Sequence, residues 1–121
     1  MGAMWVPRTA MGPPVILTDE IVLPVNGALD MAACPRLREQ IDDLLDRYPR
    51  RHLVLDLSGV SFMDSSGVGL VLGRYRRLET RQLRLRLVGV RPPVARVLRM
   101  SGLHGIIAIE ETEHPEQRGG W

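Results

Sequence analysis

The spacing of apolar residues changes along the chain, and each spacing predicts one kind of secondary structure. Between residues 34 and 48, apolar side chains recur about every 3.6 residues, the period of a helix that buries one face. This stripe consists of Leu37, Ile41, Leu44, Leu45 and Tyr48. Pro49 ends the predicted helix, because proline cannot donate a helical hydrogen bond.

Residues 15–27, VILTDEIVLPVNG, have the pattern of two short strands joined by a turn at residues 18–20. Pro24 lies within the second of these strands. Because proline has no N–H to donate to a neighbouring strand, its presence predicts either a sheet edge or a bulge there.

Three later segments are also predicted strands. Residues 52–57, HLVLDL, are mostly apolar, which is typical of a strand buried in a parallel sheet. Residues 83–90, LRLRLVGV, begin with alternating leucine and arginine, which predicts a strand with one solvated face. Residues 105–110, GIIAIE, form the last predicted strand.

Two helices are expected between these strands, over residues 64–79 and 92–101. The second of them ends at Gly102, a residue suited to the left-handed conformation that terminates helices. Its inward-facing residues are expected to be Val94, Val97 and Leu98. Strand and helix therefore alternate from residue 52 onward. This order predicts an α/β fold, with a mixed, mostly parallel β-sheet and α-helices packed against it.

Composition limits the kind of protein that can carry this fold. The chain has 121 residues and one cysteine, Cys34, which predicts a single domain without an internal disulfide or a multi-cysteine metal site. It has no apolar run near the ~20 residues of a membrane span, and its first residues lack a signal peptide's apolar core. We expect a cytoplasmic protein with no cofactor. The domain is expected at residues 15–112, between an arm at 1–14 and a tail at 113–121.

Charge is unevenly distributed, although the formal net charge is only +2. All 16 basic residues are arginine, and nine of them lie between Arg74 and Arg99, where Glu79 is the only acid. Such a stripe suits a solvated surface, an acidic protein or a nucleic-acid backbone. Aromatic residues make up only 4% of the chain, which disfavours stacking on single-stranded bases. We therefore favour a solvated or protein-binding surface over nucleic acid.

The junction Asp64-Ser65-Ser66-Gly67 places polar chemistry at the carboxyl end of a strand, where α/β proteins carry functional loops. Its sequence lacks the Gly-x-Ser-x-Gly pattern of a hydrolase nucleophile. No pattern brings a histidine to Ser65, the candidates being His52, His104 and His114. We therefore expect no enzyme. Either Asp64 or Ser65 would cap the following helix, and capping is the favoured role of Ser66.

Gly67, Gly69 and Gly73 in the same helix are a second candidate for ligand binding. Their spacing differs from both the dinucleotide fingerprint and the P-loop, and the chain has no lysine to bind a phosphate. Gly69 and Gly73 are four residues apart and so share one helix face. We predict that this face packs closely against the sheet.

The junction also carries a resemblance to a known family. Residues 55–78, LDLSGVSFMDSSGVGLVLGRYRRL, resemble the signature of the STAS-domain anti-sigma factor antagonists of bacterial sporulation and stress response. Residues 27–30, GALD, resemble the family's Gly-Glu-Leu-Asp element, with Ala28 where glutamate is frequent. Residues 97–109, VLRMSGLHGIIAI, resemble its last helix and strand. The three segments keep the order and spacing of the family.

The resemblance implies a binding module that is switched by phosphorylation. Unphosphorylated members bind an anti-sigma factor that is also a serine kinase, and this frees the sigma factor. The kinase phosphorylates the serine after the motif aspartate, binding is lost, and a phosphatase reverses the change. Ser65 matches this serine, with Ser66 as the second choice. The partner-binding residues are then expected to be Asp30, Asp64, Ser65, Ser66 and Gly67.

Two alternatives stay open. The chain could be a STAS module of another signalling complex, in which the serine is used differently. It could also be a basic nucleic-acid-binding domain that uses the stripe from Arg74 to Arg99. Salt-dependent retention of DNA or RNA that is unaffected by changing Ser65 would favour this second alternative.

Overall fold

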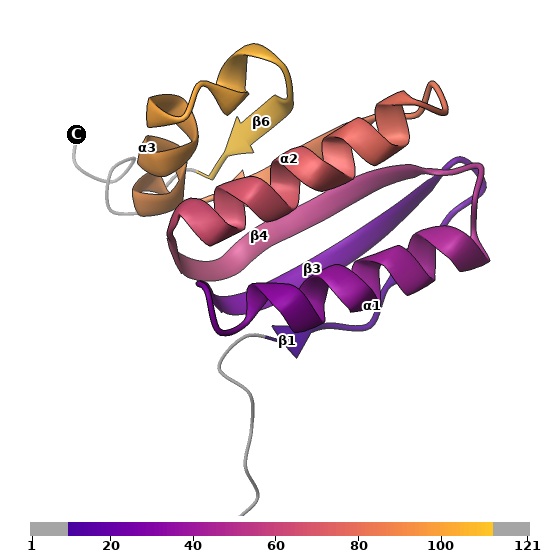
Figure 1. The fold of residues 1–121 in the computed structure, drawn as a ribbon, viewed down its shortest axis with the longest axis horizontal. Coiled ribbons are helices and arrows are strands. Elements are labelled where there is room, and N and C mark those ends of the chain that lie inside the picture. The colour runs from indigo at the N-terminus through magenta and orange to yellow at the C-terminus, as the bar shows by residue number, and fades with distance from the viewer. Residues whose placement is uncertain (1–9, 113–121) are drawn as a thin grey trace, which may run out of the picture.

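The computed structural model describes residues 10–112, which form one β-sheet with helices packed against it (Figure 1). The strands are β1 (Ala10–Met11), β2 (Val15–Ile16), β3 (Glu20–Leu29), β4 (His52–Met63), β5 (Leu85–Val90) and β6 (Ala108–Glu111). The helices are α1 (Cys34–Arg47), α2 (Ser65–Glu79), α3 (Pro92–Met100) and the short 3-10 helix η1 (Leu103–Gly105). Within residues 10–112, no helix has both the length and the apolar character needed to cross a membrane.

The sheet is mixed and mostly parallel, which confirms the predicted α/β fold. Its strand order is β1-β3-β4-β5-β6, and β2 pairs with the same strand, β3, as β1 does. The pairs β3–β4, β4–β5 and β5–β6 are parallel, whereas β1 and β2 run antiparallel to β3. All four parallel strands therefore end at the same edge of the sheet.

The opening hairpin forms where it was expected, as β2 and the start of β3. The Leu17 N–H donates to the Glu20 carbonyl at 2.8 Å and closes the turn between them. The pairing of β3 with β4 shifts its register between Pro24 and Asn26, which is the predicted bulge. The Pro24 carbonyl still accepts a bond from the Gly12 N–H at 2.9 Å, because proline lacks only the donor.

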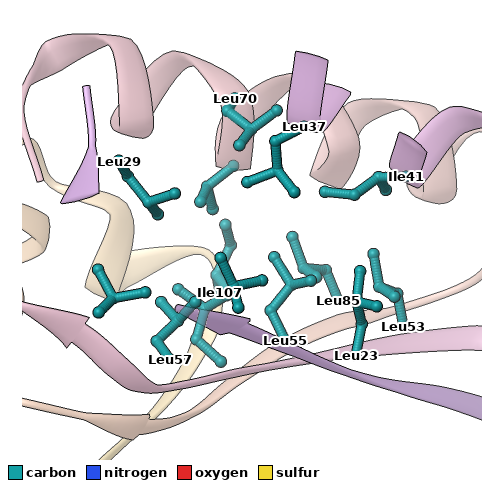
Figure 2. Close-up of a cluster of buried hydrophobic side chains, with 14 of the residues drawn as sticks. Leu23, Leu29, Leu37, Ile41, Leu53, Leu55, Leu57, Leu70, Leu85 and Ile107 are labelled. Atoms are coloured by element: carbon teal, nitrogen blue, oxygen red, sulfur yellow. The ribbon is translucent and has the colours of Figure 1, made fainter. Parts of the chain in front are cut away.

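The hydrophobic core lies between the helices and one face of the sheet. Figure 2 shows Leu37, Ile41 and Leu70 pointing from the helices towards leucines on the strands. The strand residues that face them are Ile21, Leu23, Val25, Leu53, Leu55, Leu57, Leu85 and Leu87. Val94 and Leu98 of α3 are buried in the same cluster, and Val97 packs at its margin. The apolar stripes of the sequence are thus the buried faces of the helices.

Two strands begin later than the sequence pattern indicates. Leu83 is outside β5, because its N–H donates to the Leu78 carbonyl at 2.9 Å in the turn that follows α2. Gly105 belongs to η1 and so precedes β6. Gly102 has φ 83°, the left-handed conformation expected of it at the end of α3.

The predicted domain limits overlap the described part of the chain only in part. Ala10 and Met11, expected in the arm, pair with Asn26 and Val25 of β3 as strand β1. Residues 1–9 and 113–121 lie outside the described residues, so the rest of the arm and the tail remain predictions.

Candidate functional site

The candidate site forms where β3 and β4 end side by side. Leu29 and Met63, the last residues of the two strands, are partners in the parallel ladder. The Asp64 N–H donates to the Leu29 carbonyl at 3.2 Å, which extends the pairing by one bond. Asp30 and Asp64 therefore leave the sheet together, although they are 34 positions apart in the sequence.

Each of these aspartates holds the start of a helical segment through its side chain. The Asp64 Oδ1 accepts a hydrogen bond from the Ser66 N–H at 2.8 Å, and Asp64 is the N-cap of α2. The Asp30 Oδ1 accepts from the Ala33 N–H at 3.0 Å, one residue before α1. Both carboxylates satisfy N–H groups that have no partner inside a helix. Of the two predicted caps, the structure selects Asp64. The capping role favoured for Ser66 is wrong, because Asp64 is the N-cap and Ser66 lies inside the helix.

Ser65 is the first residue of α2 and is exposed. Among the described residues, its hydroxyl has no hydrogen-bond partner, because the neighbouring carboxylate already performs the capping. Ser66 is half-buried. Ser65 thus offers a hydroxyl that an enzyme can reach without breaking a bond of the fold.

Gly67 allows α2 to start directly on the strand ends. It is buried, and a Cβ atom at this position would lie 2.6 Å from the Met63 Cγ and 3.0 Å from the Leu29 carbonyl oxygen. The second contact is with backbone, which cannot rotate away as a side chain can. Any larger residue would therefore push the Asp64-Ser65 corner off the sheet.

The prediction that Gly69 and Gly73 pack closely against the sheet is wrong. A Cβ at either position would meet nothing within 4 Å. The buried residues of α2 are Gly67, Leu70, Val71 and Leu78, which lie on the opposite side of the helix. At about 100° per residue, Ser65, Gly69 and Gly73 instead share an outward face on which two positions have no side chain.

Two large apolar side chains lie beside the junction and were missed in the sequence. Met31 follows Asp30 and is 75% exposed, and Phe62 precedes Met63 and is 51% exposed. Both are exposed apolar side chains close in sequence to the motif aspartates, and so are candidates for contact with another protein. We define the Ser65 surface as Met31, Phe62, Ser65, Ser66 and Gly69. The available signal was an apolar residue within two positions of each motif aspartate.

Charge around the junction is mainly negative. The pKa of the Cys34 thiol is raised, first by burial and then by the nearby Asp64 and Asp30 carboxylates. The thiol is therefore neutral and packed in the core, as expected for a small apolar residue at the start of a helix.

The arginine stripe is partly neutralised by acids from other elements. Several of its arginines are engaged in ion pairs with acids: Arg74 and Arg77 with Asp42, Arg77 also with Asp46, Arg86 with Glu20 and Glu110, and Arg99 with Glu111. The first group joins α2 to α1, with distances of 3.3 Å from the Arg74 Nε and 3.0 Å from an Arg77 guanidinium nitrogen to the Asp42 Oδ1. These pairs fix the helix that carries Ser65.

The fold and this junction match a known class of domain. The STAS domain model matches residues 13–115. The chain is 38% identical over 93 residues to an anti-sigma F factor antagonist of Paenibacillus polymyxa, covering 77% of this chain and 80% of the relative. The chain therefore belongs to the STAS domain family. Within that family it belongs with the anti-sigma factor antagonists.

Solved structures agree with this placement. The anti-sigma factor antagonist SpoIIAA in its unphosphorylated form is 30% identical, with a TM-score of 0.73 over 93% of this chain and 98% of SpoIIAA. The phosphorylated form of the Bacillus cell fate determinant SpoIIAA has a TM-score of 0.67, at 30% identity over 92% of this chain and 98% of SpoIIAA.

Proposed function

We propose that the chain is an anti-sigma factor antagonist whose Ser65 surface binds an anti-sigma factor with serine-kinase activity. In its unphosphorylated form it would bind this kinase and release the sigma factor. Phosphorylation of Ser65 would end the binding, and a phosphatase would restore it. The chain would act in the cytoplasm as a substrate and binding module and not as a catalyst.

The observation that carries the proposal is the free hydroxyl of Ser65 on the first residue of α2. A phosphoacceptor must reach the active site of a kinase, and this exposed side chain does not participate in the fold. Met31 and Phe62 provide apolar area beside it for a protein partner. The relatives that are named anti-sigma factor antagonists, and the phosphorylated form of SpoIIAA, support the same assignment.

Phosphate on Ser65 would be compatible with the fold. The start of α2 is the positive end of the helix dipole, which stabilises a negative charge. The new charge of about −1.5 to −2 would instead meet the partner, in an interface formed around a small hydroxyl. A 100-fold loss of affinity needs only about 2.7 kcal/mol, within the cost of an unpaired charge in an interface.

Two substitutions test the mechanism. Ser65→Asp should keep the melting temperature, because an acid suits the first turn of a helix, yet bind the kinase about 100-fold more weakly. Ser65→Ala should lose no hydrogen bond, keep most of the binding and resist phosphorylation. Calorimetric unfolding, titration with the cognate kinase and nucleotide, and mass-spectrometric mapping after incubation with ATP measure these properties.

Three results would contradict the proposal. The charge switch is wrong if Ser65→Asp binds the kinase as tightly as the wild type. Phosphate that maps reproducibly to Ser66 would move the acceptor by one residue. If the wild-type chain binds no anti-sigma kinase, the result would favour the first alternative named above, a STAS module of another signalling complex.

A further inference from the structure

A hollow of about 780 Å³ lies at the end of the domain opposite Ser65. It is formed by the loop from α1 to β4 and the turn from α2 to β5, which meet at the amino ends of the parallel strands, on the right of Figure 1. Its described lining residues are Pro49, Arg50, His52, Thr80, Arg81, Gln82 and Leu83. None of these is acidic, so the hollow is positively charged.

The turn on one side of the hollow is held in a single conformation. The Leu83 N–H donates to the Leu78 carbonyl and the Gln82 N–H to the Glu79 carbonyl, each at 2.9 Å. This is the bonding of a Schellman motif, whose turning residue adopts the left-handed conformation and is usually glycine. Here that residue is Gln82, with φ 59°. A strained residue at the rim of a pocket is a feature associated with functional sites.

The other side of the hollow is joined to this turn by hydrogen bonds. The Arg84 N–H donates to the His52 Nδ1 at 2.9 Å, and the Leu53 N–H donates to the Arg84 carbonyl at 2.9 Å. Because its Nδ1 accepts a bond, a neutral His52 ring carries its proton on Nε2 and offers a donor there. The guanidinium of Arg51 lies 5.2 Å from the Tyr48 ring centre, and its Nε donates to the Leu17 carbonyl at 2.7 Å. Both loops are thus fixed before any ligand arrives.

Arg50 and Arg81 differ from the ion-paired arginines of the stripe. Both are exposed, and among the described residues neither has an acidic partner, whereas Arg74, Arg77 and Arg86 do. Both come shortly after the C-terminal ends of α1 and α2, where a cation interacts favourably with the helix dipole. That interaction does not explain why both arginines line the same hollow. They remain available to an anion from outside the chain.

We propose that this hollow binds an acidic segment of a partner protein. A guanidinium group can donate two parallel hydrogen bonds to one carboxylate, so Arg50 and Arg81 suit two acidic side chains of an extended peptide. His52, Thr80 and Gln82 supply further polar groups, and Pro49 and Leu83 supply apolar wall. The site is separate from the Ser65 surface, so it would hold the partner in both phosphorylation states.

A peptide fits these observations better than a nucleic acid. Nucleic-acid sites follow the phosphate backbone with a long row of cations, and single-stranded sites add aromatic stacking. The described lining has two arginines and no aromatic residue, and Arg77 and Arg86 beyond it are ion-paired to acids. The hollow therefore offers a short basic site and not a long row of cations.

The test uses the whole chain and a fluorescein-labelled hexaglutamate peptide, with binding followed by fluorescence anisotropy at low salt. Arg50→Ala combined with Arg81→Ala should weaken binding about tenfold or more, since each charged hydrogen bond contributes strongly. Arg36→Ala combined with Arg96→Ala is the matched control. It removes the same charge from exposed arginines outside the hollow and should change affinity less than twofold. Arg50→Lys with Arg81→Lys should give intermediate affinity, because lysine keeps the charge but cannot donate two parallel hydrogen bonds to one carboxylate.

Thermal unfolding of each variant checks that the fold is retained. We expect it to be, because all four arginines are exposed. Equal losses in the hollow and control variants would show general charge attraction and overturn the proposal. No binding of the peptide by the wild type would also overturn it. A labelled single-stranded oligonucleotide that depends on Arg50 and Arg81, when the peptide does not, would assign the hollow to nucleic acid. None of these results depends on Ser65.

Discussion

The two ends of the parallel strands differ in how closely α2 lies against the sheet. At the carboxyl end, α2 begins directly on the strands, with Gly67 pressed against Leu29 and Asp64 capping the helix. At the amino end, the same helix ends in the turn that forms one side of the hollow. The first end presents an exposed, free hydroxyl, and the second presents a basic hollow. One helix can therefore separate two unlike surfaces by about 20 Å, given its ~1.5 Å rise per residue.

The largest expected effect on stability is at the tightly packed end. Gly67→Ala should lower the free energy of unfolding by about 1–3 kcal/mol, because its Cβ overlaps Met63 and the Leu29 backbone. Gly69→Ala is the matched control and should raise stability by roughly 0.5–1 kcal/mol, because its Cβ meets open space on a helix. Denaturant unfolding measures both. Equal destabilisation by the two changes would remove the distinction between inner and outer glycines.

The capping assignment predicts a smaller difference at the same end. Asp64→Ala should cost about 1 kcal/mol, because the Ser66 N–H loses its acceptor. Ser66→Ala should change stability by less than about 0.5 kcal/mol, because its hydroxyl makes no bond within residues 10–112. Thermal melts of the two variants, with Asp64→Asn as a conservative control, would decide. A larger loss from Ser66→Ala would return the cap to that serine.

The smallest effect is expected at the amino end, in the turn. Gln82→Gly should raise the free energy of unfolding by about 0.5 kcal/mol, because glycine adopts a positive φ without a steric penalty but loses more chain entropy on folding. Gln82→Ala keeps the Cβ and should give no gain. Chemical denaturation with both variants separates the backbone effect from loss of the side chain. A stability loss with Gln82→Gly would mean that the glutamine side chain stabilises the fold by more than its positive φ destabilises it.

The sequence predicted most of the fold because apolar periodicity reports burial directly. The stripe on α1, the buried strand β4 and the bulge at Pro24 were all visible as patterns. The parts of the structure that the sequence did not predict depend on contacts between segments far apart in the chain. The meeting of Asp30 with Asp64 at the paired strand ends was expected only from the family resemblance, because nothing in either segment encodes the register of β3 against β4.

Glycine was the residue type least interpretable from sequence. Gly67, Gly69 and Gly73 occur in one helix, yet only Gly67 lies in close contact with the sheet. Spacing shows which of them share a face, but whether that face points to the sheet depends on the rotation of α2 about its own axis. The ion pairs of the arginine stripe were hidden for the same reason, since their acids come from α1, β3 and β6.

The capping of α2 by Asp64 also bears on how fast Ser65 could be switched. The serine hydroxyl makes no bond that must open before modification, and Arg74 and Arg77 tie its helix to Asp42. Local unfolding, which limits access to many buried modification sites, would not be a step in the reaction. The lifetime of each binding state would then follow the encounter and turnover rates of the kinase and phosphatase. The chain would report the balance between those two enzymes without a delay of its own.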